Sequence, residues 1–302
     1  MLRARRLPDW MRKDLSRGQE AARTDVLLKS LGLHTICESG RCPNRDECYS
    51  QKTATFMIMG DRCTRSCGFC SVSTGHPEVL DPEEPRRVAE AVAGLGLKHV
   101  VVTSVTRDDL QDEGASQYLD VLRQIRSITA GIIIEILTPD FRRTQRLAVR
   151  LILRGQPNIF NHNIETVPRL YRRVRPQGNY ERSLQIFREI KTYREPVLTK
   201  SGLMLGLGET HEEVIQVLKD LRNAGCRMLT LGQYLKSSAS GLPVEAYIHP
   251  EVFLNYKNEA MNIGFTCVES APYVRSSFHA KESYETLRSS LATRQIQPME
   301  RN

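Results

Sequence analysis

Hydrophobic and polar positions alternate with two different periods between residue 53 and residue 264. Short runs rich in β-branched and other apolar residues predict six β-strands, and these runs are TATFMIMG, KHVVVTSV, GIIIEIL, NIFNHNIE, TKSGLMLGL and CRMLTLGQYL. A segment with a helical period follows each run, near residues 82–96, 114–129, 142–154, 179–195, 210–225 and 249–264. The pattern therefore predicts six strand–helix units in succession.

The fifth predicted helix has the clearest pattern. Its apolar stripe recurs at positions i, i+3, i+4 and i+7, which are Val214, Val217, Leu218 and Leu221. Thr210 and Glu213 match the capping-box pattern at its start. The first predicted helix begins with Asp81 and Pro82, an acidic cap followed by a proline at the first helical position. Both segments thus carry their own start signals.

The alternation of strands and helices predicts an α/β fold with a parallel sheet, because right-handed crossovers place the helices on the sheet. Six units favour a partial (β/α)6 barrel of the TIM type, and a doubly wound open sheet is the alternative from periodicity alone. Polar residues gather after the predicted strands, as in DRCTRSCGFC, TSVTRDD, LTPD and GLGET, and barrel enzymes carry their chemistry on that rim. We expect the barrel at residues 51–264, with an N-terminal extension at 1–50 and a C-terminal extension at 265–302.

The composition is that of a chain able to bury a large core. Of its 302 residues 40% are hydrophobic, and we find neither an apolar leader nor an apolar run long enough to span a bilayer. We therefore expect a cytoplasmic protein, in a reducing compartment where clustered cysteines bind metal more often than they form disulfides. The net charge of +8 and the pI near 9.1 favour an acidic partner, such as nucleic acid, an anionic membrane or an acidic carrier protein. A basic surface without a dedicated partner is an equal alternative.

Six of the eight cysteines form two triplets. The upstream triplet has the spacing C-x4-C-x5-C and consists of Cys37, Cys42 and Cys48. The downstream triplet has the spacing C-x3-C-x2-C and consists of Cys63, Cys67 and Cys70. Three thiolates on one [4Fe–4S] cubane leave one iron open to an exogenous ligand, whereas a structural zinc site needs a fourth ligand, for which the nearest candidate is His76. Cys226 and Cys267 lie in or beside apolar runs and are predicted to be buried, inert thiols.

The downstream loop resembles the signature of the radical S-adenosylmethionine (SAM) enzymes, in which the methionine part of SAM binds the open iron. Further motifs narrow the resemblance to the lipoyl synthase family, and these are GLHTICESGRCPNRDEC, TSVTRDDLQDEGA, IEILTPDF, FNHNIETVPRLYRRVRP, SGLMLGLGET, LGQYL and VRSSFHA. The upstream triplet is the specific element, because that family holds an auxiliary cluster there. The chain departs from the family pattern at Ser71, where Asp is usual, at Phe278, where Tyr is common, and in the loop 236–244, which lacks the usual Pro and His.

The resemblance implies a radical SAM sulfurtransferase that inserts two sulfur atoms, at C6 and C8, into an octanoyl chain bound to a lysine of a lipoyl carrier domain. The implied cofactors are SAM, cleaved to a 5′-deoxyadenosyl radical, and two [4Fe–4S] clusters, of which the auxiliary one donates the sulfur. Such carbons offer no acidity to a base, so a radical in a water-excluding site is needed. The implied partners are octanoylated lipoyl domains of 2-oxoacid dehydrogenase E2 subunits and the glycine cleavage H protein. A flavodoxin or ferredoxin would donate electrons, and neither membrane nor nucleic acid is expected.

Two alternatives stay open from the sequence. Another two-cluster radical SAM enzyme could insert sulfur into a free small molecule. A non-catalytic basic metal-cluster protein could bind nucleic acid, although the chain shows no recognition-helix or base-stacking pattern.

The resemblance also implies SAM contacts at the strand ends, and the candidates are Phe69, Thr103, Ser104, Glu135, Asn161, Asn163, Glu165 and Arg175. Asn161, Asn163 and Glu165 alternate along one predicted strand and therefore share a face, which in a barrel could be the interior. Glu135 lies between isoleucines and is costly to bury without a partner. A ribose or amino group of the cofactor could be that partner.

Other candidates have simpler interpretations beside them. Thr103 and Ser104 could equally cap the loop after their strand. Arg175 could meet a carboxylate, but a solvated arginine is the preferred interpretation. His162 stands between two asparagines on a strand and is predicted to be a hydrogen-bonded structural residue rather than a base.

Ser277 is the expected fourth ligand of the auxiliary cluster, because the family pattern places that ligand at the third position of RSSF. A hydroxyl oxygen is a harder, less suitable ligand than thiolate for iron in a sulfur cluster. Ser277 would therefore form the bond that is easily broken, and it joins the three upstream cysteines as the expected catalytic set. Without the resemblance, Ser276 and Ser277 are better explained as caps of a C-terminal helical turn at 278–287.

Overall fold

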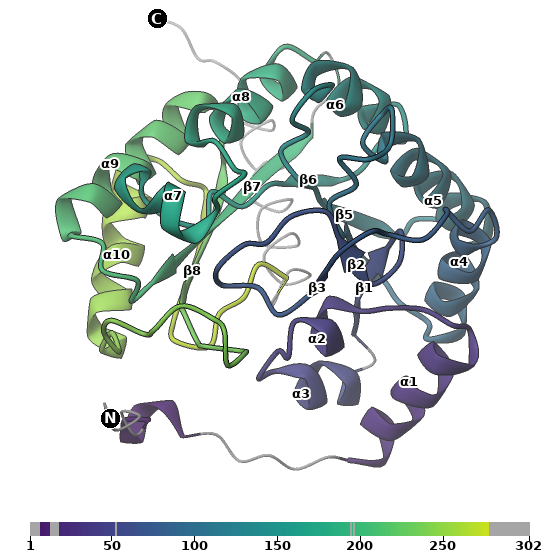
Figure 1. The fold of residues 1–302 in the computed structure, drawn as a ribbon, viewed down its shortest axis with the longest axis horizontal. Coiled ribbons are helices and arrows are strands. Elements are labelled where there is room, and N and C mark those ends of the chain that lie inside the picture. The colour runs from purple at the N-terminus through teal and green to yellow at the C-terminus, as the bar shows by residue number, and fades with distance from the viewer. Residues whose placement is uncertain (1–6, 13–17, 52, 194, 196, 278–302) are drawn as a thin grey trace, which may run out of the picture.

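The computed structural model describes residues 7–12, 18–51, 53–193, 195 and 197–277. Within this part of the chain the main feature is a parallel sheet of seven strands in the order β1-β4-β5-β6-β7-β8-β9 (Figure 1). The strands are β1 (Thr55–Ile58), β4 (His99–Ser104), β5 (Ile133–Leu137), β6 (Ile159–Asn161), β7 (Leu198–Leu205), β8 (Met228–Gln233) and β9 (Cys267–Ser270). The sheet curves into an incomplete barrel with β1 and β9 at its edges, which confirms the predicted α/β class.

Six helices cover the outer face of this sheet (Figure 1). They are α4 (Glu84–Gly94), α5 (Ala115–Ile128), α6 (Gln145–Leu153), α8 (Tyr180–Lys191), α9 (His211–Ala224) and α10 (Pro250–Ile263). Each corresponds to one of the six predicted helices. The strand–helix alternation was therefore predicted correctly from periodicity.

The starts of two helices test the predicted capping signals. Thr210 and Glu213 form the complete capping box of α9, as predicted, and its apolar stripe is fully buried. Helix α4 begins two residues later than predicted. Asp81 accepts a hydrogen bond from the backbone N–H of Glu83 at 2.8 Å and so closes a turn that precedes the helix.

Several short elements were not predicted. Strand β9 lies in the segment expected to be an extension, and its four residues are too few for a visible alternation. The N-terminal part forms η1 (Asp9–Met11), α1 (Gln19–Ser30), α2 (Ile36–Ser39) and α3 (Arg45–Ser50). Other short elements are the paired strands β2 (Arg62–Cys63) and β3 (Ser73–Thr74), and, between β6 and α8, η2 (Pro168–Leu170) and α7 (Tyr171–Val174).

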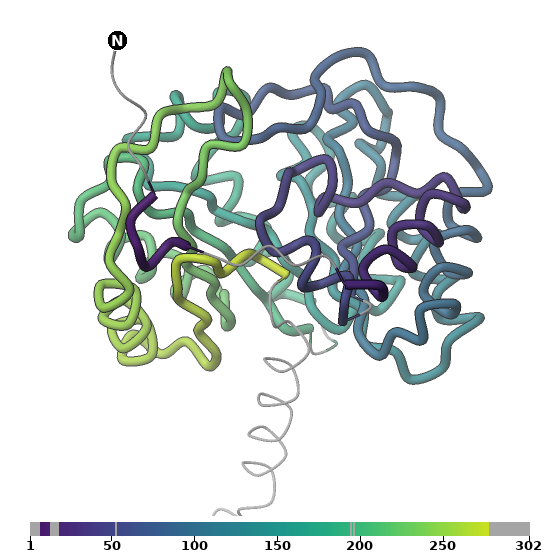
Figure 2. The backbone as a smooth tube through the Cα atoms, turned by 90° about the horizontal axis from the view of Figure 1, so that it is seen from below, coloured from purple at the N-terminus to yellow at the C-terminus, as the bar shows by residue number. Residues whose placement is uncertain are grey.

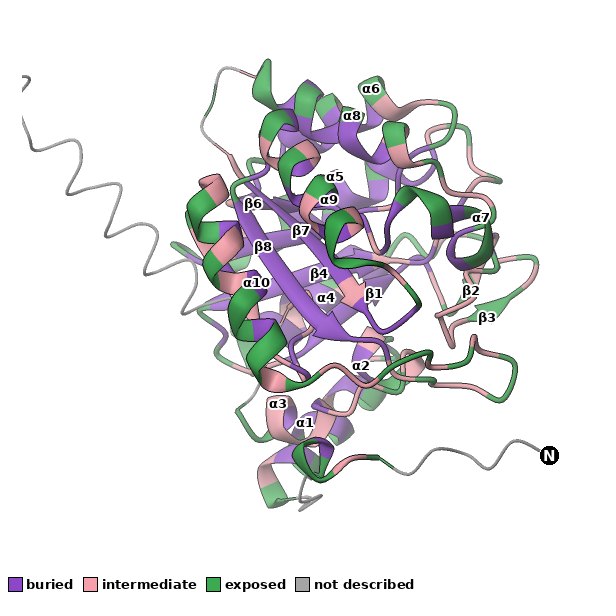
Figure 3. Cartoon of the chain, turned by 90° about the vertical axis from the view of Figure 1, so that its left-hand side faces the viewer, coloured by how far each residue is buried: buried purple, intermediate pink, exposed green. Residues whose placement is uncertain are grey.

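The strands β1 and β4–β8 of the large sheet are mostly buried, whereas the helices that cover it are buried on the side that faces the sheet (Figure 3). This is the expected pattern of a parallel sheet, in which both faces are covered. One large apolar cluster packs around β1, β4 and β5, and a second around β7 and β8. Because these clusters fill the body of the fold, reactive groups gather at strand ends and in the loops that follow them.

The two ends of the described chain lie side by side (Figure 2). The hydroxyl of Tyr273 donates to the carbonyl of Met11 at 2.5 Å, and the ring of Trp10 packs edge-on against His249 with centroids 5.0 Å apart. The N-terminal segment therefore supports the chain that leaves β9. In the described part of the protein, no helix has both the length and the apolar character needed to cross a membrane.

Candidate functional site

The downstream cysteine triplet lies in the long loop between β1 and α4. The backbone N–H groups of Arg65 and Thr106 donate to Cys63 Sγ at 3.4 and 3.3 Å. The N–H of Val72 donates to Cys70 Sγ at 3.5 Å. Hydrogen bonds to sulfur stabilise thiolates and tune the potential of iron–sulfur clusters. These hydrogen bonds therefore favour the thiolate forms of Cys63 and Cys70, which are the forms that bind iron.

The electrostatics of this loop favour a bound cation whenever its cysteines are present as thiolates. Burial, together with the charges of neighbouring groups that include Cys63, raises the pKa of Cys67 to about 12 and that of Cys70 to about 11. Arg175 opposes this rise at Cys67. Three thiolates this close repel one another unless positive charge lies between them, and the irons of a [4Fe–4S] cluster supply it. The donor set therefore fits such a cluster.

Arg65 anchors this loop from a position between two of the cysteines. Its side chain is 4% exposed, donates twice to Asp108 at 2.7 Å and also donates to Asp140. Arg182 donates to the same Asp140 at 2.8 and 2.9 Å. Burial opposes ionisation of Asp140, but the surrounding arginines, Arg65 foremost, lower its pKa to about 2. The network ties the cluster loop to the segments after β4 and β5.

Sequence reasoning missed this ionic network. The signal was a basic residue between two ligand cysteines, together with an acidic residue shortly after each of two neighbouring strands. That pattern becomes informative only when the strand order places those loops beside one another.

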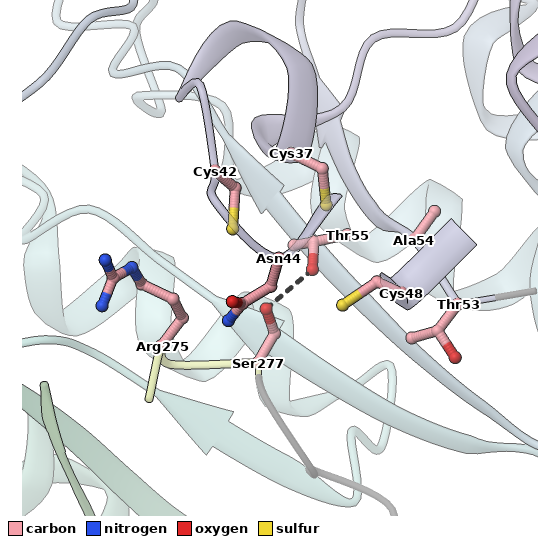
Figure 4. A pocket seen from close by; sticks show the side chains of 9 residues that line it. All are labelled: Cys37, Cys42, Asn44, Cys48, Thr53, Ala54, Thr55, Arg275 and Ser277. Carbon is pink, nitrogen blue, oxygen red and sulfur yellow. Dashed lines mark hydrogen bonds between the residues drawn. The ribbon is translucent and has the colours of Figure 1, made fainter. Parts of the chain in front are cut away.

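The upstream triplet lines a cavity (Figure 4). Cys37 lies on α2, Cys48 on α3 and Cys42 in the turn between them. The other residues that line the cavity are Asn44, Thr53, Ala54, Thr55, Arg275 and Ser277. Burial and, after it, the charge of Cys42 raise the pKa of Cys37 to about 11, and contact with Thr55 opposes the rise. As in the downstream loop, bound iron would offset the repulsion between these sulfurs.

Ser277 reaches this cavity from the far end of the described chain. The hydroxyl of Thr55, 222 positions away in the sequence, donates to Ser277 Oγ at 2.8 Å. The amide of Asn44 donates to the carbonyl of Tyr273 at 2.8 Å and holds the C-terminal segment against the upstream triplet. The structure thus brings Ser277 together with the three cysteines. The alternative helical turn at 278–287 lies outside the described residues.

A site for a single metal ion is not seen in the part of the chain that the structure describes. There, no group of three His, Cys, Asp or Glu side chains is placed to hold one metal ion. His76, the nearest candidate for a zinc ligand, is exposed in its loop.

Direct contacts join the two cysteine loops. The hydroxyl of Ser71, next to the downstream triplet, donates to the carbonyl of Ser39 in the upstream one at 2.8 Å. Ser237 accepts from Arg41 at 3.1 Å through its carbonyl, and its hydroxyl donates to the carbonyl of Phe69 at 3.4 Å. Ser71 and the loop 236–244, two departures from the family pattern, therefore lie between the centres. Ser71 contacts the backbone of the upstream loop, and Ser237 contacts the side chain of Arg41 and the backbone of Phe69.

Two predicted SAM contacts stand at the end of β4. Thr103 is buried, and its hydroxyl donates to the carbonyl of Leu137 at 2.9 Å. Ser104 is partly exposed and accepts from the hydroxyl of Tyr118 at 3.0 Å. Neither hydroxyl caps the next loop, so that alternative is wrong. Ser104 is the more accessible of the two.

Glu135 has a partner within the protein. Its carboxylate is fully buried and accepts from Lys200 Nζ at 3.0 and 3.2 Å and from the amide of Asn161 at 2.8 Å. The partner that the sequence argument sought in a cofactor is therefore Lys200. Lys200 was missed because it comes from β7, two strands away, and only the barrel brings the two charges together.

Arg175 is buried, so the preferred expectation of a solvated arginine is wrong. Its guanidinium donates to the carbonyl of Asn163 at 3.1 Å and lies over the ring of Tyr171 at 5.7 Å. Among the described residues it forms no ion pair. Glu165 lies nearby with φ of 69°, a strained value for a non-glycine residue. Burial raises the pKa of Glu165, and Arg175 opposes that rise.

Comparison with known proteins identifies the family. Residues 57–221 match the model of the radical SAM superfamily. The chain is 52% identical over 281 residues to the lipoyl synthase of Alkaliphilus metalliredigens, with 93% of this chain and 97% of that protein covered. It is 51% identical to lipoyl synthase 2 of Thermosynechococcus vestitus, with 93% and 99% covered. The chain belongs to the lipoyl synthase family.

Lipoyl synthases are radical SAM enzymes that use SAM and two [4Fe–4S] clusters, and the sequence of this chain contains two cysteine triplets. The crystal structure of methylornithine synthase superposes with a TM-score of 0.54 at 15% identity, covering 94% of this chain and 98% of that one. This likeness shows a shared fold alone.

The remaining predictions concern residues outside the lipoyl synthase centres. His162 is buried between the carbonyl of Thr138 at 2.8 Å and the hydroxyl of Ser183 at 3.0 Å, which confirms its structural interpretation. Cys226 is buried, as predicted, and its thiol donates to a backbone carbonyl at 3.2 Å. Cys267 is only partly buried, because it lies on the edge strand β9, and the prediction of full burial is wrong there.

Proposed function

We propose that this lipoyl synthase inserts two sulfur atoms, at C6 and C8, into an octanoyl chain carried on a lysine of a lipoyl domain. One observation carries the proposal: Ser277 meets Cys37, Cys42 and Cys48 around one cavity. Three thiolates hold iron firmly, whereas an oxygen ligand is exchangeable. A site with one exchangeable bond suits a cluster that is consumed as a sulfur source better than one that only carries electrons.

The chain positions two sets of ligands. When bound, the cofactors supply a 5′-deoxyadenosyl radical, which removes hydrogen atoms from the octanoyl chain, and the sulfur atoms that replace them. Cys63, Cys67 and Cys70 would hold the cluster that binds SAM, and the upstream cysteines with Ser277 would hold the auxiliary cluster. The contacts between the two loops, at Ser71 and Ser237, would keep these centres at a constant separation while the barrel excludes water.

Arg175 is the strongest candidate among the SAM contacts. It is a buried cation close to Cys67, without an ion pair in the described part of the chain. The carboxylate in the methionine part of SAM would form an ion pair with Arg175 through a charge-assisted hydrogen bond. Asn163 and Glu165 lie beside it and could bind the amino group or ribose of SAM.

The other proposed contacts rank lower on the same reasoning. Ser104, at the end of β4, and Phe69, in the downstream cysteine loop, are partly exposed and remain accessible to a ligand. Thr103 donates its proton to a carbonyl. Glu135 and Asn161 bind each other, and Glu135 also binds Lys200, so we assign them to the support of the site.

The partners follow from the reaction and the charge. A net charge of +8 suits an acidic carrier, for which we propose octanoylated lipoyl domains of 2-oxoacid dehydrogenase E2 subunits and the glycine cleavage H protein. We propose a flavodoxin or ferredoxin as electron donor. Reduced clusters and free thiols are maintained in the cytoplasm, where we place the protein.

Mass spectrometry of the carrier tests the function. With SAM, a reductant and octanoylated lipoyl domain, the reconstituted protein should yield a product carrying two added sulfur atoms, and it should hold about eight irons per chain. Turnover of free octanoate or dethiobiotin instead would identify a sulfur-inserting enzyme of another substrate class. About four irons per chain with the upstream cysteines dispensable would contradict the proposal.

A further inference from the structure

Thr55 lines the cavity of the proposed auxiliary cluster together with Cys37 and Ser277, and it contacts Ser277 directly (Figure 4). It is the first residue of β1 and is 3% exposed. Its hydroxyl donates to Ser277 Oγ at 2.8 Å. Thr55 also lies beside Cys37, where it opposes the rise in the pKa of that thiol.

The partner of Thr55 is unusual among the buried threonines of the sheet. Thr103, Thr199 and Thr230 also lie in strands, and each hydroxyl donates to a backbone carbonyl, at 2.9, 2.7 and 3.3 Å. Those bonds satisfy a buried hydroxyl within the fold. Thr55 instead donates across the cavity to the side chain of Ser277. The hydroxyl of Thr55 therefore bonds to a side chain that lines the cavity rather than to the backbone of the sheet.

The backbone of Thr55 is rigidly held. Thr55 pairs with Val101 of β4, and its neighbour Phe56 forms a bridge with Thr35 on the other side. A β-branched side chain in a strand also has few accessible rotamers. Ser277, in contrast, follows the last strand in an irregular segment, and a serine side chain rotates readily. The hydroxyl of Thr55, which the strand holds in place, can thus orient the hydroxyl of Ser277, which rotates more freely.

We propose that Thr55 is a positioning residue of the auxiliary site, which holds Ser277 Oγ toward the cluster and sets how readily this oxygen ligand is displaced. This inference rests on the proposed role of Ser277. A hydroxyl has one proton to donate. When Thr55 donates this proton to Ser277, the hydrogen bond would stabilise negative charge on Ser277 Oγ while that oxygen binds iron. When Ser277 leaves, the same proton can turn to Cys37.

The test uses the reconstituted holoenzyme without substrate, so its readouts do not depend on turnover. Four proteins are compared with the wild type: Thr55→Val, Thr55→Ser, Ser277→Ala and the double variant Thr55→Val with Ser277→Ala. Valine keeps the branched shape and removes the donor, whereas serine keeps the donor. The Mössbauer spectrum of the auxiliary cluster reports the ligand of its distinct iron, and an anaerobic chelator measures how fast that iron is lost.

Thr55→Val should change the spectrum of the distinct iron and increase the rate of iron loss about tenfold, the effect expected for one hydrogen bond to a charged group. Thr55→Ser should restore wild-type behaviour. In the Ser277→Ala background, Thr55→Val should add nothing, because the two residues act through one bond. Unchanged melting temperatures would show that the fold is intact.

The outcomes separate the two claims. If Ser277→Ala changes the spectrum and Thr55→Val does not, the role of Thr55 is overturned and the ligand assignment survives. If Thr55→Val has the same effect with and without Ser277, Thr55 acts through Cys37 or through packing, and the inference is wrong. If Ser277→Ala leaves the spectrum unchanged, the ligand assignment itself fails.

Discussion

At the scale of single residues, most of the buried basic side chains in the described barrel form ion pairs. Glu135 meets Lys200, and Asp140 meets Arg65 and Arg182. Burying a charge is costly unless it is paired and hydrogen-bonded. Against this background Arg175 stands out as a buried cation without an ion pair in the described chain, which is why we assign it to a ligand.

Ser277 provides the residue-scale prediction for catalysis. Ser277→Ala should leave reductive cleavage of SAM largely intact, because the cleavage site uses the downstream cysteines. Sulfur insertion should be abolished, because the auxiliary cluster loses its exchangeable ligand. The measurement is 5′-deoxyadenosine by chromatography beside the mass of the carrier. Fully thiolated product, or loss of both activities together, would show that Ser277 is not that ligand.

His162 makes stability depend on pH. Burial and, after it, Arg175 lower the pKa of His162 from 6.5 to about 4. Between these values the unfolded chain binds a proton that the folded protein does not, so stability falls as the pH falls from 6.5 toward 4. Between pH 7 and pH 5 the contribution of this residue should drop by about 2 kcal/mol.

Anaerobic thermal unfolding at the two pH values measures this effect. The wild type should lose about 4 °C more in Tm between pH 7 and pH 5 than His162→Gln does. His249→Gln, at a half-exposed position, is the matched control and should behave like the wild type. Equal losses in the wild type and His162→Gln would contradict the prediction.

At the scale of elements, each centre is a loop held by elements distant in sequence. The radical SAM loop is anchored through Arg65 to the segments after β4 and β5. The auxiliary site combines α2 and α3 with the segment after β9. For the downstream loop, parallel strands bring these connections together because the carboxyl ends of β1, β4 and β5 share one rim. The sheet fixes the positions of these segments, and the segments carry the proposed cluster ligands.

Asp140→Asn should damage one centre and spare the other. The change leaves Arg65 and Arg182 buried with one carboxylate fewer, and breaking a buried ion pair costs about 3–5 kcal/mol. A displaced cluster loop should slow SAM cleavage by about 10- to 100-fold. Electron paramagnetic resonance should show an altered radical SAM cluster beside an unchanged auxiliary cluster.

Asp81→Asn is the control for this variant, because Asp81 pairs with Arg87 at the surface. It should keep the wild-type spectrum, rate and Tm. Simultaneous loss of both cluster signals in Asp140→Asn would mean that the network supports the whole fold rather than the cluster loop.

At the scale of the whole molecule, the ends of the described chain close the site. The segment after β9 crosses from the last strand to the upstream triplet, and η1 supports it through Met11 and Tyr273. The auxiliary site therefore forms only when both ends of the barrel are in place. We expect the excess of positive charge to act at longer range, on the approach of a carrier protein.

Salt should weaken the recognition of an acidic carrier. Raising the ionic strength from low to physiological values shortens the screening length, so the KM for an octanoylated lipoyl domain should rise about three- to tenfold. The KM for SAM and the turnover of a short neutral octanoyl-lysine peptide should stay constant. Steady-state kinetics at several salt concentrations measure this. A carrier KM independent of salt would show that charge does not guide the encounter.

The sequence by itself determined the fold class and the grouping of six cysteines into two triplets, which we predict to be cluster ligands. Both are local properties: periodicity reports the strand–helix alternation, and a C-x3-C-x2-C loop is too short to separate its thiols. Motif resemblance supplied the family, the auxiliary cluster and the place of Ser277. Local pattern did not reveal β9, because four residues on an edge strand carry too weak an alternation.

Only the tertiary structure decided which distant residues meet. Glu135 and Lys200 stand 65 positions apart, and Thr55 and Ser277 stand 222 apart. Whether a charged side chain is solvated or buried depends on the partner that the fold brings to it. For this reason Arg175 was expected in solvent, and Glu135 was expected to need a cofactor. Local sequence specifies the ligands and the strands, whereas strand order specifies their neighbours.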